Sequence, residues 1–382
     1  MKGVVTVEHP GTRLVEHFGD IQDPRIDRTK RHKLLDIMIL AICGAICGAD
    51  DWVAMERFGN AKLSWFSGFL ELPNGIPSHD TFGRVFMALD PAEFQRCFIS
   101  WVGALSELLR GQVIAVDGKA LRHSYDNTGG KAAIYMVSAW ASQNHMVLGQ
   151  VEVDEKSNEI TAIPKLLRLL DLRGCIVTLD AMGCQKEIMD VIVERQGAYV
   201  LAVKGNQGVL YRDVVSLFQE AESVDYRFLA HDHCRQINKG HGRIEIRECW
   251  TISDPFYLDY LQDLRWKGLR SIVKVTAERR IGEKRETQTR YYITNLAGNA
   301  KQLLGAVRGH WSIENSLHWV LDIAFNEDQS RVRKGNGAPN LAILRQIALN
   351  LLSQEDTARC GTRNKRLMAG WDERYLLKVL GV

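Results

Sequence analysis

The chain has 382 residues, 46% of them hydrophobic and 25% charged, which is typical of a globular protein with two or three structural units and a sizeable core. Its net charge of +3 is too small to indicate a polyanionic partner by itself. The longest apolar run, Ile37–Ala49, has about 13 residues, whereas a membrane helix needs roughly 17–25, so we expect a buried helix and no membrane association. The first residues contain no apolar segment of the kind found in secretory signals.

The distribution of cysteines and of charged residues further indicates the class of protein and its location. The eight cysteines are scattered through apolar segments without a CxxC pair, which indicates reduced thiols and a cytoplasmic location. Basic residues gather in two stretches, Arg25–Lys33 and the tail from Gln329 onward, where ten Lys or Arg outnumber four acids. Local basic patches of this kind bind nucleic acid without a high overall charge.

Residues 1–110 are predicted to form a helical domain. Leu34–Cys47 is apolar on nearly all faces and is expected to be a buried helix, and Ser78 is the expected N-cap of a later helix. Asp90-Pro91 begins a further helix with apolar side chains at helical spacing. A packing role and a DNA-binding role are equally consistent with this domain.

From Gly111 the pattern changes to short strands, and residues 111–206 are predicted to form the first part of an α/β core. The predicted order is β-β-β-α-β-α-β. The first and fourth strands end in carboxylates, Asp117 and Asp180, each followed by a nearby glycine. The predicted strands are Val113–Asp117, Ala132–Trp140, Met146–Val153, Cys175–Asp180 and Tyr199–Val203, and the predicted helices are Ile160–Leu170 and Lys186–Arg195.

Residues 207–298 are predicted to be a β-rich insertion, because several of their segments alternate as strands with one polar face do. Residues 299–382 are predicted to return to the core with its last helix and a basic C-terminal tail. The expected strands of the insertion are Arg243–Thr251, Arg270–Ala277 and Thr289–Ile293, and the expected helix of the tail is Leu341–Leu352.

The helix predicted over Val307–Phe325 carries a polar stripe. Its members recur every four residues and therefore share one face of an α-helix, while Trp319, Ile313 and Ile323 lie on the opposite side. Such a stripe is either the solvent face of the helix or the wall of a site. The stripe consists of His310, Glu314, His318 and Asp322.

The acids at the strand ends have two interpretations. Considered by itself, Asp117 is either a turn residue before Gly118 or a ligand at the carboxyl edge of the sheet. Functional sites of α/β proteins lie at that edge. If the first and fourth strands are neighbours, Asp117 and Asp180 lie side by side, and the later helix can present Glu314 to both. Three carboxylates in one pocket repel unless divalent cations neutralise them. Oxygen ligands select Mg²⁺ or Mn²⁺, and two such ions support in-line displacement at phosphorus.

Several stretches of the chain resemble the DDE transposases of bacterial insertion sequences, and most closely the H-repeat-associated transposase group. They extend over nearly the whole chain, which makes the resemblance specific. It implies an α/β fold with an RNase H-like mixed sheet flanked by helices, an N-terminal helical domain, and a β-rich insertion before the last core helix. The matching stretches are DPRIDRTKRHKLLDI, LPNGIPSHDTFGRVF, AVDGKALR, EKSNEI, TLDAMGCQ, YVLAVKGNQ, HGRIEIR, HWSIENSLHWVLDIAFNEDQSRVRKGN and LAILRQIALNLL.

The same resemblance implies a function. Asp117, Asp180 and Glu314 are then the catalytic and metal-binding triad, with two Mg²⁺ or Mn²⁺ ions as cofactor. The implied activity is binding of an element's terminal inverted repeats, cleavage of double-stranded DNA, and transfer of the 3′-hydroxyl strand to target DNA. The working complex is expected to be a homodimer on DNA, associated with the nucleoid. A plain metal-dependent nuclease and an inactive DNA-binding remnant of a mobile element are the alternatives.

The helix of Glu314 departs from the signature of the wider branch, which has Tyr, Arg, Glu and Lys in one helix. The Arg and Lys of that signature contact DNA phosphates, so those contacts must be made differently here. His310 would be a weaker and pH-dependent donor, and His318 and Lys119 are other candidates. The four signature positions are occupied here by Val307, His310, Glu314 and Leu321.

The remaining candidates each have an ordinary structural interpretation beside the functional one. A solvated turn or strand face explains most of the candidate DNA contacts equally well. Asp328 is a rival third acid, although it follows the helix in a loop-like region. The cluster His231, His233, Cys234 and His241 lacks the second cysteine typical of zinc sites, which disfavours zinc. The candidate DNA-binding residues are Lys119, Lys204, Asn206, His241, Arg243, His310, His318, Arg331 and Arg333.

Overall fold

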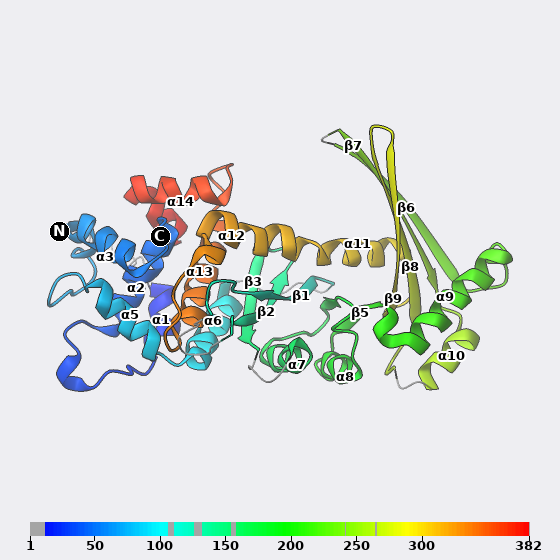
Figure 1. Cartoon of the computed structure of the whole chain (residues 1–382), viewed down its shortest axis with the longest axis horizontal. Helices are drawn as coiled ribbons and strands as arrows, with labels where there is room; N and C mark the ends of the chain where they lie inside the picture. The colour runs from blue at the N-terminus through cyan, green and yellow to red at the C-terminus, as the bar shows by residue number, and fades with distance from the viewer. Residues whose placement is uncertain are drawn as a thin grey trace, which may run out of the picture.

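The molecule is elongated, with helices at one end, a mixed sheet in the middle and two long hairpins at the other end (Figure 1). This computed structural model describes residues 12–105, 111–125, 132–153, 158–240, 242–263 and 266–381. The helices at the first end come from both termini of the chain (Figure 1). Within the described ranges, no helix has both the length and the apolar character needed to cross a membrane.

The N-terminal helices pack around α2, which is buried because nearly all of its side chains are apolar. Asp51 caps α3 and Ser78 caps α5 by accepting hydrogen bonds from backbone N–H groups, as expected for these residue types. The region contains a 3₁₀ turn at Asp27–Thr29, and the helices are α1 (Thr12–Phe18), α2 (Leu34–Ile46), α3 (Trp52–Ala61), α4 (Leu63–Phe66), α5 (His79–Ala88) and α6 (Pro91–Leu105).

The central sheet contains the predicted RNase H-like core. Its first five strands lie in the order β3-β2-β1-β4-β5, with β1 antiparallel to β2 and parallel to β4, as the sequence predicts. Helices α7 and α8 pack on one side of this sheet and α11 crosses the other (Figure 1). The bounds are β1 (Val113–Ala120), β2 (Tyr135–Ala141), β3 (Met146–Glu152), α7 (Glu159–Leu169), β4 (Ile176–Leu179), α8 (Lys186–Glu194) and β5 (Ala198–Val203).

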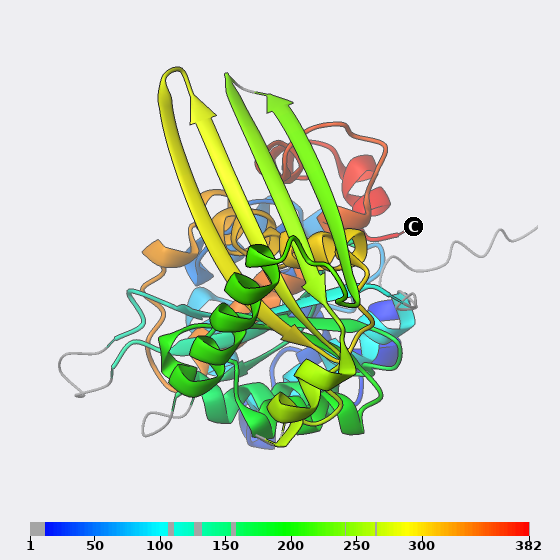
Figure 2. The same ribbon diagram turned by 90° about the vertical axis from the view of Figure 1, so that its right-hand side faces the viewer.

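The β-rich insertion continues the core sheet instead of forming a separate one. Strand β9 pairs antiparallel with β5, so that Val200 lies opposite Thr294, and a single nine-stranded sheet results. The two hairpins, β6–β7 and β8–β9, rise side by side above the rest of the molecule (Figure 2). The bounds are η2 (Gly205–Gln207), α9 (Gly208–Ser223), β6 (His231–Gly240), β7 (Arg243–Ile252), α10 (Pro255–Asp263), β8 (Ser271–Ile281) and β9 (Lys284–Thr294).

The last part of the chain returns along the sheet and ends among the N-terminal helices. The 18-residue helix α13 is buried because it lies between the sheet and helices α2, α5 and α6. The tail contains two further helices that the sequence analysis did not predict, because their short apolar faces are interrupted by basic residues. The bounds are α11 (Ala300–His310), η3 (Ile313–His318), α12 (Trp319–Phe325), η4 (Glu327–Gln329), α13 (Gly337–Gln354), α14 (Thr362–Trp371) and α15 (Glu373–Val379).

Candidate active site

Two carboxylates meet at the edge of the sheet because their strands are neighbours. Strands β1 and β4 pair in parallel, with Val116 opposite Leu179, so the residues that follow, Asp117 and Asp180, emerge beside each other. Asp180 is held in its turn by the backbone N–H groups of Met182 and Gly183, at 3.0 and 3.1 Å.

Glu314 faces the same place from the other side. A cavity of about 190 Å³ is lined by Asp117, Asp180 and Glu314 together. The structure therefore brings together the three acids that the sequence analysis singled out, from two strands and a helix far apart in the chain. Two members of the polar stripe, His310 and Glu314, line this cavity, and Glu314 is at the same time exposed to solvent.

Glu314 lies in a π-helical turn, η3, between α11 and α12. The N–H of Trp319 donates to the carbonyl of Glu314, five residues earlier, instead of four as in an α-helix. The turn buries Ile313, whereas Trp319 and Ile323 on α12 are exposed, so the prediction that these three residues share one face is wrong. Single π turns inside helices occur frequently at functional sites. Spacing alone predicts an uninterrupted α-helix here, because a π turn leaves no pattern that the apolar residues reveal.

Asp117 is the most perturbed acid of the cavity. Its pKa is raised from 3.8 to about 7, chiefly by burial and to a smaller extent by the negative charges of Asp180, Glu159 and Glu314, while a hydrogen bond from the N–H of Gly118 acts in the opposite direction. Near neutral pH this side chain therefore binds and releases a proton. Repulsion of this kind is what a cation bound between the acids would relieve.

Glu159 is a fourth acid at this site, and the sequence analysis missed it. It is the first residue of α7, which Asn158 caps, and it accepts a hydrogen bond from the Tyr135 hydroxyl behind β1. The stretch EKSNEI contains Glu159, but nothing in its spacing connects it with Asp117. Only the packing of α7 on β2 and β3 places the two carboxylates near each other.

Gly118 occupies the space between Asp117 and this Glu159–Tyr135 pair. A Cβ atom at position 118 would lie 2.6 Å from Cε1 of Tyr135 and closer still to Oε1 of Glu159. We expect Gly118→Ala to cost about 1–3 kcal/mol of unfolding free energy through overpacking and to displace Asp117 from its present orientation.

The matched control for Gly118→Ala is Gly205→Ala, in the loop after β5, where an added Cβ would meet open space. Thermal unfolding of the two variants measures the difference. If Gly118→Ala were as stable as Gly205→Ala, the tight packing behind Asp117 would not constrain the strand.

The cationic groups of the cavity come mainly from β5 and β9. Lys204 is exposed at the end of β5, and Arg290 reaches the cavity from β9, where its guanidinium lies 4.5 Å from the ring of Trp311. The sequence analysis missed Arg290, because only the pairing of β5 with β9 brings the insertion to the active-site edge. Asn206 donates to the carbonyl of Ala181 at 2.6 Å and thereby holds the loop after β5 against the Asp180 turn.

His310 also lines the cavity, one helical turn before Glu314. Its Nδ1 lies 3.1 Å from Oγ1 of Thr178. Burial lowers the pKa of His310, although the charge of Asp180 opposes the effect. At neutral pH the imidazole is therefore uncharged and available as a hydrogen-bonding group.

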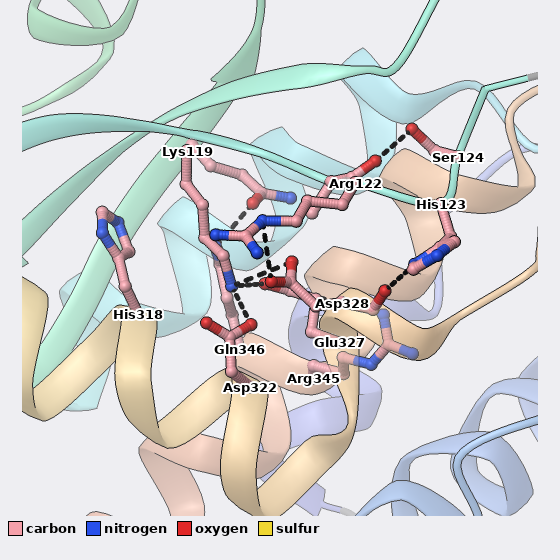
Figure 3. Close-up of polar contacts among 12 residues, drawn as sticks. Lys119, Arg122, His123, Ser124, His318, Asp322, Glu327, Asp328, Arg345 and Gln346 are labelled. Carbon is pink, nitrogen blue, oxygen red and sulfur yellow. Dashed lines mark hydrogen bonds and ion pairs between the residues drawn. The ribbon is translucent and has the colours of Figure 1, made fainter.

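Lys119 and His318 connect β1 with the helix of Glu314 (Figure 3). The Lys119 ammonium forms ion pairs with Asp322 and with Glu327, the latter at 2.9 Å. Burial and the neighbouring Lys119 lower the pKa of His318 to about 4, so the imidazole that lies 3.7 Å from Asp117 is neutral and forms no ion pair at pH 7. Both residues face the protein in this structure.

Asp328 does not line the cavity. Its Oδ2 lies 3.2 Å from Nε of Arg122, and its Oδ1 lies 3.9 Å from Nζ of Lys119. Asp328 therefore belongs to the ion-pair network behind β1 (Figure 3). Among the described acids, the cavity is thus lined by Asp117, Asp180 and Glu314.

The other predicted DNA contacts lie outside the cavity. Arg331 is exposed after η4. Arg333 donates to the carbonyl of His123 at 2.9 Å and covers the ring of Tyr125. Arg243 forms an ion pair with Glu245 on β7. His241 lies outside the described residues.

The acids of the cavity fit a hard divalent cation by their chemistry. All three are carboxylates, the ligands that Mg²⁺ and Mn²⁺ prefer. Over the ranges that the structure describes, however, no three His, Cys, Asp or Glu side chains are grouped closely enough to hold a metal ion. This includes His231, His233 and Cys234, because successive residues of β6 point to opposite faces of the sheet.

The strand order and the converging acids define an RNase H-like core. Residues 109–351 match the family described as Transposase DDE domain, and residues 15–102 match the family described as DDE_Tnp_1-associated. The chain therefore belongs to the DDE transposases.

Relatives in Escherichia coli cover almost the whole chain. The H repeat-associated putative transposase YhhI of strain K12 is 41% identical over 374 residues, which are 96% of this chain and 97% of that protein. The putative transposase YncI of O157:H7 is 40% identical over 372 residues, 96% of this chain and 94% of that protein. A piggyBac transposase synaptic complex with hairpin DNA is a distant structural likeness, at 12% identity and a TM-score of 0.43, covering 98% of this chain and 78% of that chain.

Proposed function

We propose that this chain cleaves double-stranded DNA at the ends of a mobile element and joins the freed 3′-hydroxyl to target DNA, with Asp117, Asp180 and Glu314 as its catalytic acids. The observation that carries the proposal is the convergence of these three acids on one cavity. The raised pKa of Asp117 supports it, because a carboxyl group that is buried beside other acids is typical of functional sites.

The same three carboxylates are the proposed ligands of two Mg²⁺ or Mn²⁺ ions. Bound there, the ions would activate the attacking water or 3′-hydroxyl and stabilise the leaving oxygen. The chain's own residues orient the DNA. Lys204 and Arg290 bring positive charge to the cavity and are the proposed phosphate contacts, which compensates for the absence of Arg and Lys from the signature positions that His310 and Leu321 occupy. Neutral His310 contributes a hydrogen bond.

The proposed partners are the element's terminal inverted repeats and a target duplex. Two ends must be joined to one target, so we propose that two copies of the chain act together on DNA. We further propose that the protein works in the cytoplasm, on the nucleoid.

The test is a strand-transfer assay with Mg²⁺ or Mn²⁺ on a duplex that carries the ends of the element encoding this chain. We expect Glu314→Gln to lower the rate by about 10³-fold or more, because it removes a charge that holds the metal ions in the transition state. The matched control is Asp328→Asn, which neutralises the nearby acid outside the cavity and is expected to retain activity within about tenfold.

The two alternatives predict different outcomes of the same assay. A plain nuclease would nick the duplex without requiring the element's ends and without joining. A DNA-binding remnant would bind the duplex in a salt-dependent manner and never cleave it. If Asp328→Asn abolished the reaction and Glu314→Gln did not, Glu314 would not be the third acid.

A further inference from the structure

A groove of about 1060 Å³ lies between the N-terminal helices and the segment that follows the helix of Glu314. One wall is formed by the beginning of α3 and by α5, and the other by residues 326–337. It is separate from the cavity of the three acids, because the lining residues of the two have no member in common.

Cations from both walls face this groove. Arg84 lies on α5, and Arg331 and Lys334 lie on the opposite segment; all three side chains are exposed. Within the described part of the chain, none of these three side chains forms an ion pair with a carboxylate. The groove therefore presents positive charge that the protein itself does not neutralise.

Most of the acids that line the groove already interact with other groups of the protein. Asp50 forms an ion pair with Arg366 at 2.6 Å, and Asp51 accepts the N–H of Ala54 as the cap of α3. Asp80 is exposed and lies 3.6 Å from His79. In addition, α3, α5 and α13 all begin at the groove, and the positive ends of their helix dipoles add to the field that an anion would meet there.

The groove is also aligned with the candidate active site. Its second wall begins at Asn326, where α12 ends, and α12 continues the helix that carries Glu314. Twelve residues separate Glu314 from Asn326, which corresponds to roughly 18 Å along a helix. This distance equals about five base pairs of duplex DNA. A duplex that runs from the cavity along α12 would therefore reach the groove.

We propose that this groove binds the phosphate backbone of the duplex about half a helical turn from the cleavage site, and that the N-terminal helical domain is thereby a DNA-binding domain. The inference rests on the proposed function, because it is DNA at the catalytic acids that places a duplex along α12. Unpaired cations on two facing walls match the repeating negative charge of a DNA backbone.

The test compares two triple variants of equal charge. Arg84→Ala/Arg331→Ala/Lys334→Ala removes the groove cations, and Arg212→Ala/Arg227→Ala/Lys267→Ala removes three exposed cations near α9 and α10, at the other end of the molecule (Figure 1). Binding is measured by fluorescence anisotropy with a labelled duplex of mixed sequence, about 40 base pairs long to span both sites. EDTA is present, so that cleavage does not contribute.

We expect the groove variant to bind at least about tenfold more weakly near 0.1 M salt, and the slope of log affinity against log salt to fall by about 2–3. The control variant should lose much less. Hydrogen exchange supplies a second measurement on the unmodified chain, in which the duplex should protect α5 and residues 329–337. Equal binding by the two variants, without that protection, would overturn the groove assignment alone. A wild-type chain that bound no duplex would instead overturn the proposed function.

Discussion

Asp117→Asn is expected to make the metal-free protein more stable while abolishing DNA cleavage. The native carboxylate is buried beside Asp180, Glu159 and Glu314, which raises its pKa from 3.8 to about 7. The folded chain therefore binds this proton more tightly than the unfolded chain does. A shift of this size corresponds to about 2–4 kcal/mol once partial solvent access is allowed for.

Because the pKa of Asp117 is raised in the folded state, the stability difference between the wild type and Asp117→Asn depends on pH. Below pH 3.8 Asp117 is protonated in both states and carries no penalty. Between pH 3.8 and about 7 the penalty grows as pH rises, and above about pH 7 it is complete. The advantage of the asparagine variant should follow the same course and reach about 3–6 °C in melting temperature at pH 8.

Thermal unfolding in EDTA between about pH 5 and 8 measures this difference across the titration. Asp259→Asn, an exposed acid on α10, is the matched control and should change little. Addition of Mg²⁺ should stabilise the wild type more than Asp117→Asn and reduce the gap, because the cation replaces the repulsion with attraction. An asparagine variant that melts below the wild type at pH 8 would contradict the repulsion that we infer.

Lys119→Met is expected to be among the most destabilising single changes in the core. The ammonium is nearly buried between Asp322 and Glu327, and Glu327 in turn is only 3% exposed and lies 3.9 Å from the buried Arg345. Removal of one member of a buried charge network leaves the others uncompensated, which costs about 3–5 kcal/mol. We expect a fall in melting temperature of about 4–7 °C at pH 7.

The same change should disable the site more than the loss of stability explains. Lys119 is two residues from Asp117 on β1, and its partner Asp322 lies on the helix of Glu314 (Figure 3). Without this contact the strand and the helix lose a connection that fixes the acids relative to each other. Strand transfer measured well below the melting temperature of the variant should therefore fall markedly.

Two further variants distinguish the loss of the Lys119 ion-pair network from a general effect of substituting a lysine. Lys301→Met removes an exposed lysine of α11 and should be nearly neutral. Lys119→Met/Asp322→Asn removes both charges of one pair and should recover part of the lost stability, because it leaves one fewer uncompensated carboxylate. Additive losses in the double variant would show that the two side chains do not act as a pair.

Local sequence patterns predicted the order of the core strands, the convergence of the acids and the helical N-terminal region. Strands β1 and β4 are continuous apolar runs that end in an acid, and parallel neighbours deliver both acids to one edge. Glu314 followed from its position on a polar stripe, although the π turn itself has no sequence signature. Ser78 was predictable as a cap because its side chain acts on the nearest backbone.

Local sequence patterns did not predict the roles of residues that depend on contacts between segments far apart in the chain. Glu159 reaches Asp117 only through the packing of α7, and Arg290 reaches the cavity only because β9 joins β5. Strand β6 was missed because its residues are exposed and polar on both faces, so no apolar alternation marks it. Lys119 appeared to be a phosphate contact because its acidic partners follow some two hundred residues later.

The joining of the insertion to β5 also determines when the protein can fold. Strand β5 ends at Val203, yet its second neighbour, β9, begins at Lys284, and Glu314 is made later still. During synthesis the edge of β5 stays open while the whole insertion is translated, and open strand edges promote aggregation. A chain that stops inside the insertion has an unpaired core edge and two of the three acids. Shortened copies of such a gene are therefore expected to yield insoluble products instead of a smaller working enzyme.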